Sequence, residues 1–153
     1  MINFDNPLNA LVQINELRGN LPALEKALPE LLEAPDKTKS PMALDAAVLA
    51  LGDICRSKQE VNPGIEELAL SDNPRRRAMF CHVIGYAGDN GLDYSGHIMR
   101  LAKDESPEVR LRAVQCIQRL RDLGMQDTER ILDEATRDPD PKVRARAMAD
   151  HSF

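Results

Sequence analysis

The chain has 153 residues, of which 42% are hydrophobic and 29% are charged, and its formal net charge is −5 at pH 7. This balance excludes an intrinsically disordered chain, because the apolar fraction can form a core and the net charge is small. The acidic excess also argues against nucleic acid as the main partner, since phosphate binding depends on a concentrated cationic surface.

A helix-capping residue stands directly before a proline at five points of the chain. The prolines follow one another at intervals of 33 or 34 residues, in the pairs Asn6-Pro7, Ser40-Pro41, Asn73-Pro74, Ser106-Pro107 and Asp140-Pro141. A capping side chain accepts hydrogen bonds from the free amides of the first helical turn, and a proline at the first helical position loses no bond. Each pair, including Ser106-Pro107, therefore predicts a capped helix start. The constant period predicts a stack of helical repeats.

The N-terminal part of the chain predicts a cap helix followed by the first helix pair. Residues 7–18 form the expected cap helix. Residues 21–34 have the apolar spacing of a helix, in which Pro29 marks a kink or a late start, and a linker over 35–39 follows. The strongly apolar residues 41–56 form the second proline-started helix.

The rest of the chain repeats the alternation of a short helix with a proline-started one. The expected helices cover residues 62–70, 74–87, 93–103, 107–122, 127–137 and 141–150. The composition of residues 88–91, between the expected helices 74–87 and 93–103, predicts a turn. Gly88 is expected to be the C-cap of the first helix and Asp93 the N-cap of the second. The sequence thus predicts one all-α domain over 1–153. It consists of about nine helices, the cap helix 7–18 and the helix pairs 21–56, 62–87, 93–122 and 127–150.

Aligning the four later units on their prolines separates a buried face from an exposed one. Positions six, seven and ten after the proline are small or apolar and define the buried face, from Ala47, Val48 and Leu51 to Ala147 and Met148. Positions one, four, five, eight and twelve define the opposite face, where aromatic residues, Met and Arg are the types enriched in protein interfaces. A small shift of register would instead place its apolar members in the core. The candidate partner-binding residues of this face are Met42, Leu49, Arg75, Met79, His82, Tyr86, Leu111, Arg112, Arg119 and Arg146.

Two sets of arginines have different expected roles. Those three residues after the proline, Arg77, Arg110 and Arg144, are expected to form a structural ladder between repeats by pairing with Asp72, Asp104 or Asp138. The others, Arg112 and Arg146 with Arg75, Arg119 and Lys142, form a cationic ridge. This ridge is either a binding site for an acidic peptide or phosphate, or an ordinary solvated face.

No constellation of residues favours catalysis. Cys81 and His82 are adjacent in sequence, but neighbouring helical residues point about 100° apart and cannot act as nucleophile and base together. His97 and His151 are isolated, no cluster has metal-ligand spacing, and no phosphate-binding loop is present. We therefore expect a protein that is not an enzyme and binds no cofactor.

The three cysteines and the N-terminus bear on the cellular location. Cys55, Cys81 and Cys116 each lie inside a helical pattern and without short paired spacing, as expected for small core residues in a reducing compartment. The N-terminus lacks a signal-peptide pattern, and no apolar run is long enough to cross a membrane. These features predict a soluble cytoplasmic protein.

The segments 104–114 and 138–148 resemble the HEAT-like repeats of the phycobilisome-lyase (PBS lyase) type. In that family an acidic residue, a proline, Val-Arg and a later Ala recur at the start of the second helix of each unit. Residues 71–78 match this pattern in part, whereas the unit at Pro41 departs from it, with Leu44 in place of the arginine. The resemblance implies a right-handed α-solenoid whose proline-started helices line the concave side. It also implies a role mostly in protein–protein contact, with bilin-lyase subunits and a DNA glycosylase group as exceptions.

The leading hypothesis is a non-enzymatic module that holds a partner protein or peptide on its concave helices. The alternatives are binding of nucleic acid or a phosphate ligand through the arginine ridge, and an accessory subunit of a bilin-lyase-like enzyme. An open terminal repeat normally needs a polar outer face. The C-terminal unit, 127–150, is therefore expected either to be its own cap or to continue the stack onto a second copy of the chain.

Overall fold

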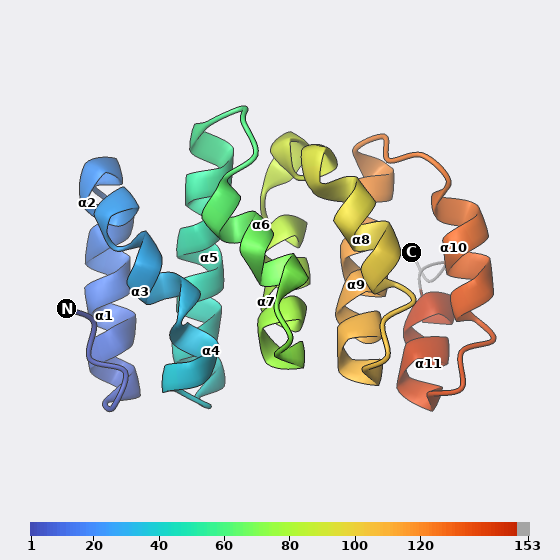
Figure 1. Cartoon of the computed structure of the whole chain (residues 1–153), viewed down its shortest axis with the longest axis horizontal. Helices are drawn as coiled ribbons and strands as arrows, with labels where there is room; N and C mark the ends of the chain where they lie inside the picture. The colour runs from blue at the N-terminus through green and yellow to red at the C-terminus, as the bar shows by residue number, and fades with distance from the viewer. Residues whose placement is uncertain (150–153) are drawn as a thin grey trace.

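The computed structural model describes residues 1–149 and shows two layers of helices (Figure 1). One layer contains the helices that begin at the five prolines: α1 (Pro7–Arg18), α5 (Pro41–Ser57), α7 (Pro74–Gly85), α9 (Pro107–Asp122) and α11 (Pro141–Ala149). They stand side by side in chain order, and each packs against the next. All five predicted starts are therefore confirmed.

The second layer covers one side of the first and is built from shorter elements. These are α2 (Leu21–Lys26), α3 (Leu28–Leu32), α4 (Ala34–Lys37), α6 (Pro63–Leu70), the 3-10 helix η1 (Gly88–Tyr94), α8 (Ser95–Leu101) and α10 (Thr128–Ala135). No strand occurs in residues 1–149, so this part of the chain is an all-α solenoid. The right-handed sense of its superhelix stays a prediction.

The second layer differs from the predicted one where the chain is rich in proline. Residues 21–34 do not form one kinked helix but belong to three short ones, α2, α3 and α4, each of which has a proline at its first or second position. A proline has no amide to donate and disfavours helical backbone before it, so each one ends the preceding helix. The described chain consequently has eleven α-helices instead of about nine.

The turn expected at Gly88 to Gly91 is instead part of η1. Gly88 has the left-handed φ of 64° expected of a residue that follows a helix end. Asp93 does not cap the next helix, because α8 begins after Tyr94 without a side-chain cap.

The predicted caps are present at four of the five proline starts. The side chains of Asn6, Ser40, Asn73 and Asp140 accept hydrogen bonds from amides of the following turn. Ser106 does not; its side chain makes no cap bond, and its own amide donates to Asp104 Oδ2 at 2.9 Å. The prediction for Ser106 is therefore wrong, because the Asp104 carboxylate, and not the Ser106 hydroxyl, holds the turn.

The core lies between the two layers and follows the predicted repeat positions. The residues at positions six and ten, among them Ala47, Leu51, Phe80 and Ile84, are fully buried. Position seven is buried in three units, but Met148 in α11 is 57% exposed, contrary to the prediction. No described helix follows α11 in the stack and covers it, whereas each earlier unit is followed by another.

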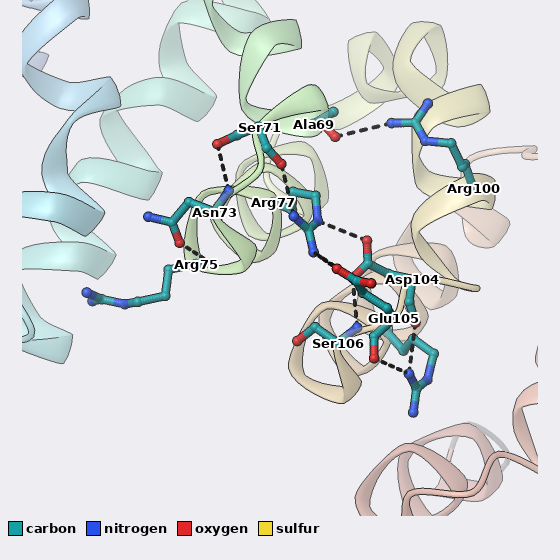
Figure 2. A network of polar contacts seen from close by, with 10 residues as sticks. Ala69, Ser71, Asn73, Arg75, Arg77, Arg100, Asp104, Glu105 and Ser106 are labelled. Atoms are coloured by element: carbon teal, nitrogen blue, oxygen red, sulfur yellow. Dashed lines mark hydrogen bonds and ion pairs between the residues drawn. The ribbon is translucent and has the colours of Figure 1, made fainter.

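The predicted arginine ladder is confirmed for Arg77, whose pair is drawn in Figure 2, and for Arg110. Arg144 instead donates to the backbone carbonyls of Asp138 and Pro139, at 2.7 and 3.1 Å. Arg77 in α7 donates from Nε and Nη2 to the two carboxylate oxygens of Asp104, at 2.9 and 3.0 Å. Arg110 in α9 pairs in the same way with Asp138, at 2.9 and 3.1 Å. Burial works to raise the pKa of Asp138, but hydrogen bonds from Arg110 and the Asp140 amide lower it below its usual value.

At the last four of the five prolines, the side chain of the residue three positions earlier also holds the turn before the helix. Thr38, Ser71, Asp104 and Asp138 each accept the amide of the residue directly before the proline, at 2.9 to 3.1 Å. Only the side chains of the last two also accept hydrogen bonds from an arginine. The sequence accounts for this difference between the units. In the earlier unit, Leu44 stands at the position of the ladder arginine and the uncharged Ser71 at the position of its aspartate.

Candidate functional site

The face of the proline-started layer that is turned away from the second layer has two adjoining hollows. The first, which we call the α5–α7 hollow, has a volume of about 180 Å³. Its floor contains the apolar residues Leu44, Val48, Ala78 and Met79. Its rim carries charged residues of both signs, Asp45, Arg75, Glu108 and Arg112.

The second hollow, which we call the arginine hollow, lies between α7, α9 and α11 and has a volume of about 220 Å³. It shares His82 and Arg112 with the first, so the two hollows adjoin each other across the helices, and we call them together the groove. Each is smaller than the 300 Å³ or so at which drug-sized ligand pockets begin, and both are open at the surface. This geometry suits the side chains of an extended partner segment better than an enclosed small molecule. The arginine hollow is lined by Cys81, His82, Gly85, Tyr86, Arg112, Gln115, Cys116, Arg119 and Arg146.

Tyr86 and Arg119 meet at one end of the arginine hollow. The guanidinium carbon of Arg119 lies 4.3 Å from the centre of the Tyr86 ring, and its Nη2 donates to the Tyr86 hydroxyl at 3.4 Å. This is the geometry of a cation–π contact, which orients the guanidinium without neutralising its charge. Gly85 lies beside this arginine, since a Cβ there would be 3.4 Å from Arg119 Nη1.

Arg112 and Arg146 occupy the other part of the hollow, both five residues after their proline. Arg112 donates to Gln115 Oε1 at 3.4 Å, and Arg146 donates from Nε to Gln118 Oε1 at 2.8 Å. Gln118 is buried and is held in turn by its own bond to the Arg146 carbonyl at 2.9 Å. These partners are neutral, so they position the two guanidinium groups and leave their charge uncompensated.

The arginine hollow is consequently a concentration of positive charge in an acidic chain. Across the part of the chain that the structure describes, Arg112, Arg119 and Arg146 make no ion pair, and no acidic side chain lines this hollow. Burial lowers the pKa of His82. The nearby charges of Arg112 and Arg119 lower this pKa further, whereas Asp45 acts to raise it. His82 is therefore neutral at pH 7, as expected beside uncompensated cations.

The structure brings together seven of the ten predicted site residues in this groove. They are Arg75, Met79, His82, Tyr86, Arg112, Arg119 and Arg146. Met42, Leu49 and Leu111 lie outside both hollows. Met42 is 41% exposed, while Leu49 and Leu111 are half-buried beside neighbouring helices.

Two of the seven groove residues have a different setting from the predicted one. Met79 is only 6% exposed and forms part of the floor, because position five lies at the edge of the face where the adjacent helices pack. Arg75 donates to the carbonyl oxygens of Pro35 and Thr38, at 2.6 and 3.1 Å. It therefore fastens α7 to the end of α4, and it is less available for a partner than the other arginines.

Gly85 and Gln118 are site residues that the sequence interpretation missed. Both stand eleven residues after their proline, and Gly52 occupies the same position in α5, where a Cβ would lie 3.3 Å from Tyr86 Cβ. A glycine at this position admits the side chain at position twelve of the next unit, Tyr86 in one case and Arg119 in the other. The recurrence of glycine at position eleven was the available signal.

The cysteines are core residues, as predicted. Cys55, Cys81 and Cys116 are buried and unpaired. Burial raises the pKa of all three thiols. The pKa is about 11 for Cys55 and about 12 for Cys116, and that of Cys81 is also raised. Such thiols stay protonated near neutral pH and are poor nucleophiles.

No group of three or more His, Cys, Asp or Glu side chains in residues 1–149 is placed to hold a metal ion. No helix in the same range is long and apolar enough to cross a membrane.

Two larger hollows, of about 420 and 470 Å³, lie at the N-terminal end of the stack, beside Met1, Ile2 and Glu30. They contain none of the predicted site residues. Their walls depend on the first residues of the chain, and Met1 itself is fully exposed. The groove is the stronger candidate because its walls are packed helices.

Comparison with known families agrees with the architecture. Residues 96–120, which span α8 and the greater part of α9, match the family model described as HEAT repeat. This match supports a HEAT-like repeat protein, a class whose repeats generally serve as protein-interaction modules. No curated protein matches the chain, and no solved structure matches it.

Proposed function

We propose that this HEAT-like repeat protein is a non-enzymatic interaction module that binds an extended segment of a partner protein in the groove formed by α5, α7, α9 and α11. The observation that carries the proposal is the continuity of the two hollows through His82 and Arg112. An apolar floor, an oriented aromatic side chain and arginines are the residue types that dominate protein interfaces.

The mechanism is rigid display of a fixed surface. The helices that line the groove are locked to one another by the buried core and by the ladder pairs Arg77–Asp104 and Arg110–Asp138. A partner then meets side chains that are already positioned, so little conformational entropy is lost on the module's side during binding.

The finer family assignment belongs to the same proposal. The acidic residue, proline and Val-Arg of the segments beginning at Asp104 and Asp138 support the PBS lyase type of HEAT-like repeat. We also propose a cytoplasmic location, which the three protonated core thiols support.

Site-specific cross-linking tests the proposed surface without changing its arginines. Random peptides displayed on phage are selected against the wild-type chain. A photoreactive phenylalanine analogue then replaces either Asp45 at the groove or Arg130 in α10, both of which are exposed. The selected peptides are expected to cross-link at position 45 and not at position 130. Selection of no peptide, or cross-linking at position 130 alone, would contradict the proposal.

A further inference from the structure

We infer that the arginine hollow binds a short acidic segment of the partner. The carboxylate side chains of this segment serve as the counterions of Arg112, Arg119 and Arg146. This inference rests on the proposed function and adds the chemistry of the segment and its direction along the groove. Its basis is charge complementarity, since the three arginines lie together without an ion pair among the described residues.

The three guanidinium groups differ from those of Arg75, Arg77 and Arg110 in the groups that they bond. Arg77 and Arg110 hold aspartates, and Arg75 holds two backbone carbonyls. Arg112 and Arg146 are instead positioned by glutamines, and Arg119 by the Tyr86 ring. Neutral partners fix the geometry of a guanidinium and leave it able to form the shorter and stronger bonds that it makes with a carboxylate.

The spacing of the arginines favours several carboxylates over one anionic group. Arg112 and Arg119 are seven residues apart on α9, which corresponds to about 10 Å along the helix axis. Arg146 lies at the position on α11 that Arg112 has on α9. An extended or polyproline-II segment rises about 3.1–3.4 Å per residue, so acidic residues three apart match this distance.

The adjoining hollow limits the negative charge to one end of the partner. Its rim includes Asp45 and Glu108, which repel an anion, and its floor is apolar. A nucleic-acid strand carries a phosphate at every residue and would meet these carboxylates as it continued along the groove. A peptide avoids this repulsion, because its acidic residues can end where its apolar residues begin. We therefore assign acidic residues to the arginine hollow and an apolar side chain to the α5–α7 hollow.

Peptide binding to matched charge variants tests this assignment. The groove variant carries Arg112→Gln, Arg119→Gln and Arg146→Gln. The control variant carries Lys103→Gln, Arg130→Gln and Arg137→Gln, which remove the same charge from exposed residues at the end of α8, in α10 and just after it. Circular dichroism first establishes that both variants are folded. The probes are a fluorescent peptide with an apolar residue and three spaced glutamates, its glutamine counterpart, and an oligonucleotide of the same charge, followed by fluorescence anisotropy.

The wild type and the control variant are expected to bind the glutamate peptide within about twofold of each other, and the groove variant roughly thirtyfold more weakly. The glutamine peptide should bind wild type at least about tenfold more weakly, and affinity for the glutamate peptide should fall between about 50 and 200 mM salt. Equal losses in the two variants, or tighter binding of the oligonucleotide, would overturn the inference. If phage-selected peptides cross-link at position 45 but show no acidic preference, the proposed function stands and this inference fails.

Discussion

Arg77 reaches from α7 to Asp104, which lies 27 residues later in the sequence, and both side chains are about nine-tenths buried (Figure 2). The same arginine also donates to the Ser71 carbonyl at 2.9 Å. One side chain therefore joins the end of its own unit's loop to the loop of the next unit.

The first prediction concerns the contribution of the Arg77–Asp104 pair to the free energy of unfolding. Asp104→Ser leaves the Arg77 guanidinium buried without its carboxylate, and we expect the free energy of unfolding to fall by about 3 kcal/mol. The substituted serine can still accept the Ser106 amide, as Ser71 accepts the Asn73 amide. The loss therefore reports the ion pair and not the turn.

The preceding unit supplies the compensating change, because it has Leu44 and Ser71 at the two equivalent positions. The double variant Arg77→Leu/Asp104→Ser should recover most of the stability, with a coupling energy of about 1–3 kcal/mol in urea denaturation. Additive losses in the double-mutant cycle would show that the two side chains stabilise the stack independently.

The second prediction concerns the effect of pH on His82. Because burial and the nearby Arg112 and Arg119 lower its pKa, the folded chain binds a proton at this site more weakly than the unfolded chain, whose value is near 6.5. Stability from this site is therefore complete above about pH 6.5 and is lost as the pH falls from there towards the folded-state pKa. Urea midpoints at about pH 7.5 and 5.5 should differ less in His82→Gln than in the wild type. An equal difference in both proteins would contradict this assignment.

The third prediction concerns the close approach of η1 to α7. A Cβ on Gly91 would lie 2.8 Å from the Ile84 carbonyl oxygen and 3.1 Å from a Leu120 methyl group. Gly91→Ala should therefore destabilise the chain by about 1–3 kcal/mol, since backbone cannot move aside as a flexible side chain can. Gly96 in α8 has open space at its Cβ position, so Gly96→Ala should be neutral or stabilising by up to about 1 kcal/mol. Thermal and urea unfolding compare the two variants, and equal effects would rule out the steric explanation.

The fourth prediction concerns the unusual start of α9. Because the Ser106 side chain makes no cap bond, Ser106→Ala should change stability by less than about 0.5 kcal/mol. At the start of α6, by contrast, the Asn62 side-chain oxygen accepts two amides, those of Gly64 and Ile65, at 2.9 and 3.1 Å. Asn62→Ala should cost about 1 kcal/mol, a typical value for a lost N-cap. Chemical denaturation of both variants checks this difference, and a larger loss in Ser106→Ala would contradict it.

The groove shows how far the partner surface could be foreseen. The helical period placed His82, Tyr86, Arg112 and Arg119 on one face, since this placement depends only on spacing within single helices. The same spacing could not show that Met79 is covered, because its burial depends on how closely the next helix approaches. Nor could it distinguish the fastened Arg75 from the uncompensated Arg112, since their partners lie on different elements.

The sequence by itself determined the starts of the five proline-led helices, most of the buried columns and the ladder arginines Arg77 and Arg110, because caps, periodicity and the 33–34-residue repeat are local or repeated signals. Tertiary structure decided where the proline-rich region breaks into α2, α3 and α4, why Ser106 does not cap, and which arginines remain without a counterion. Each of these depends on distances between side chains and backbone from different units. Such distances are set by the packing of the whole stack and are not encoded in any one segment.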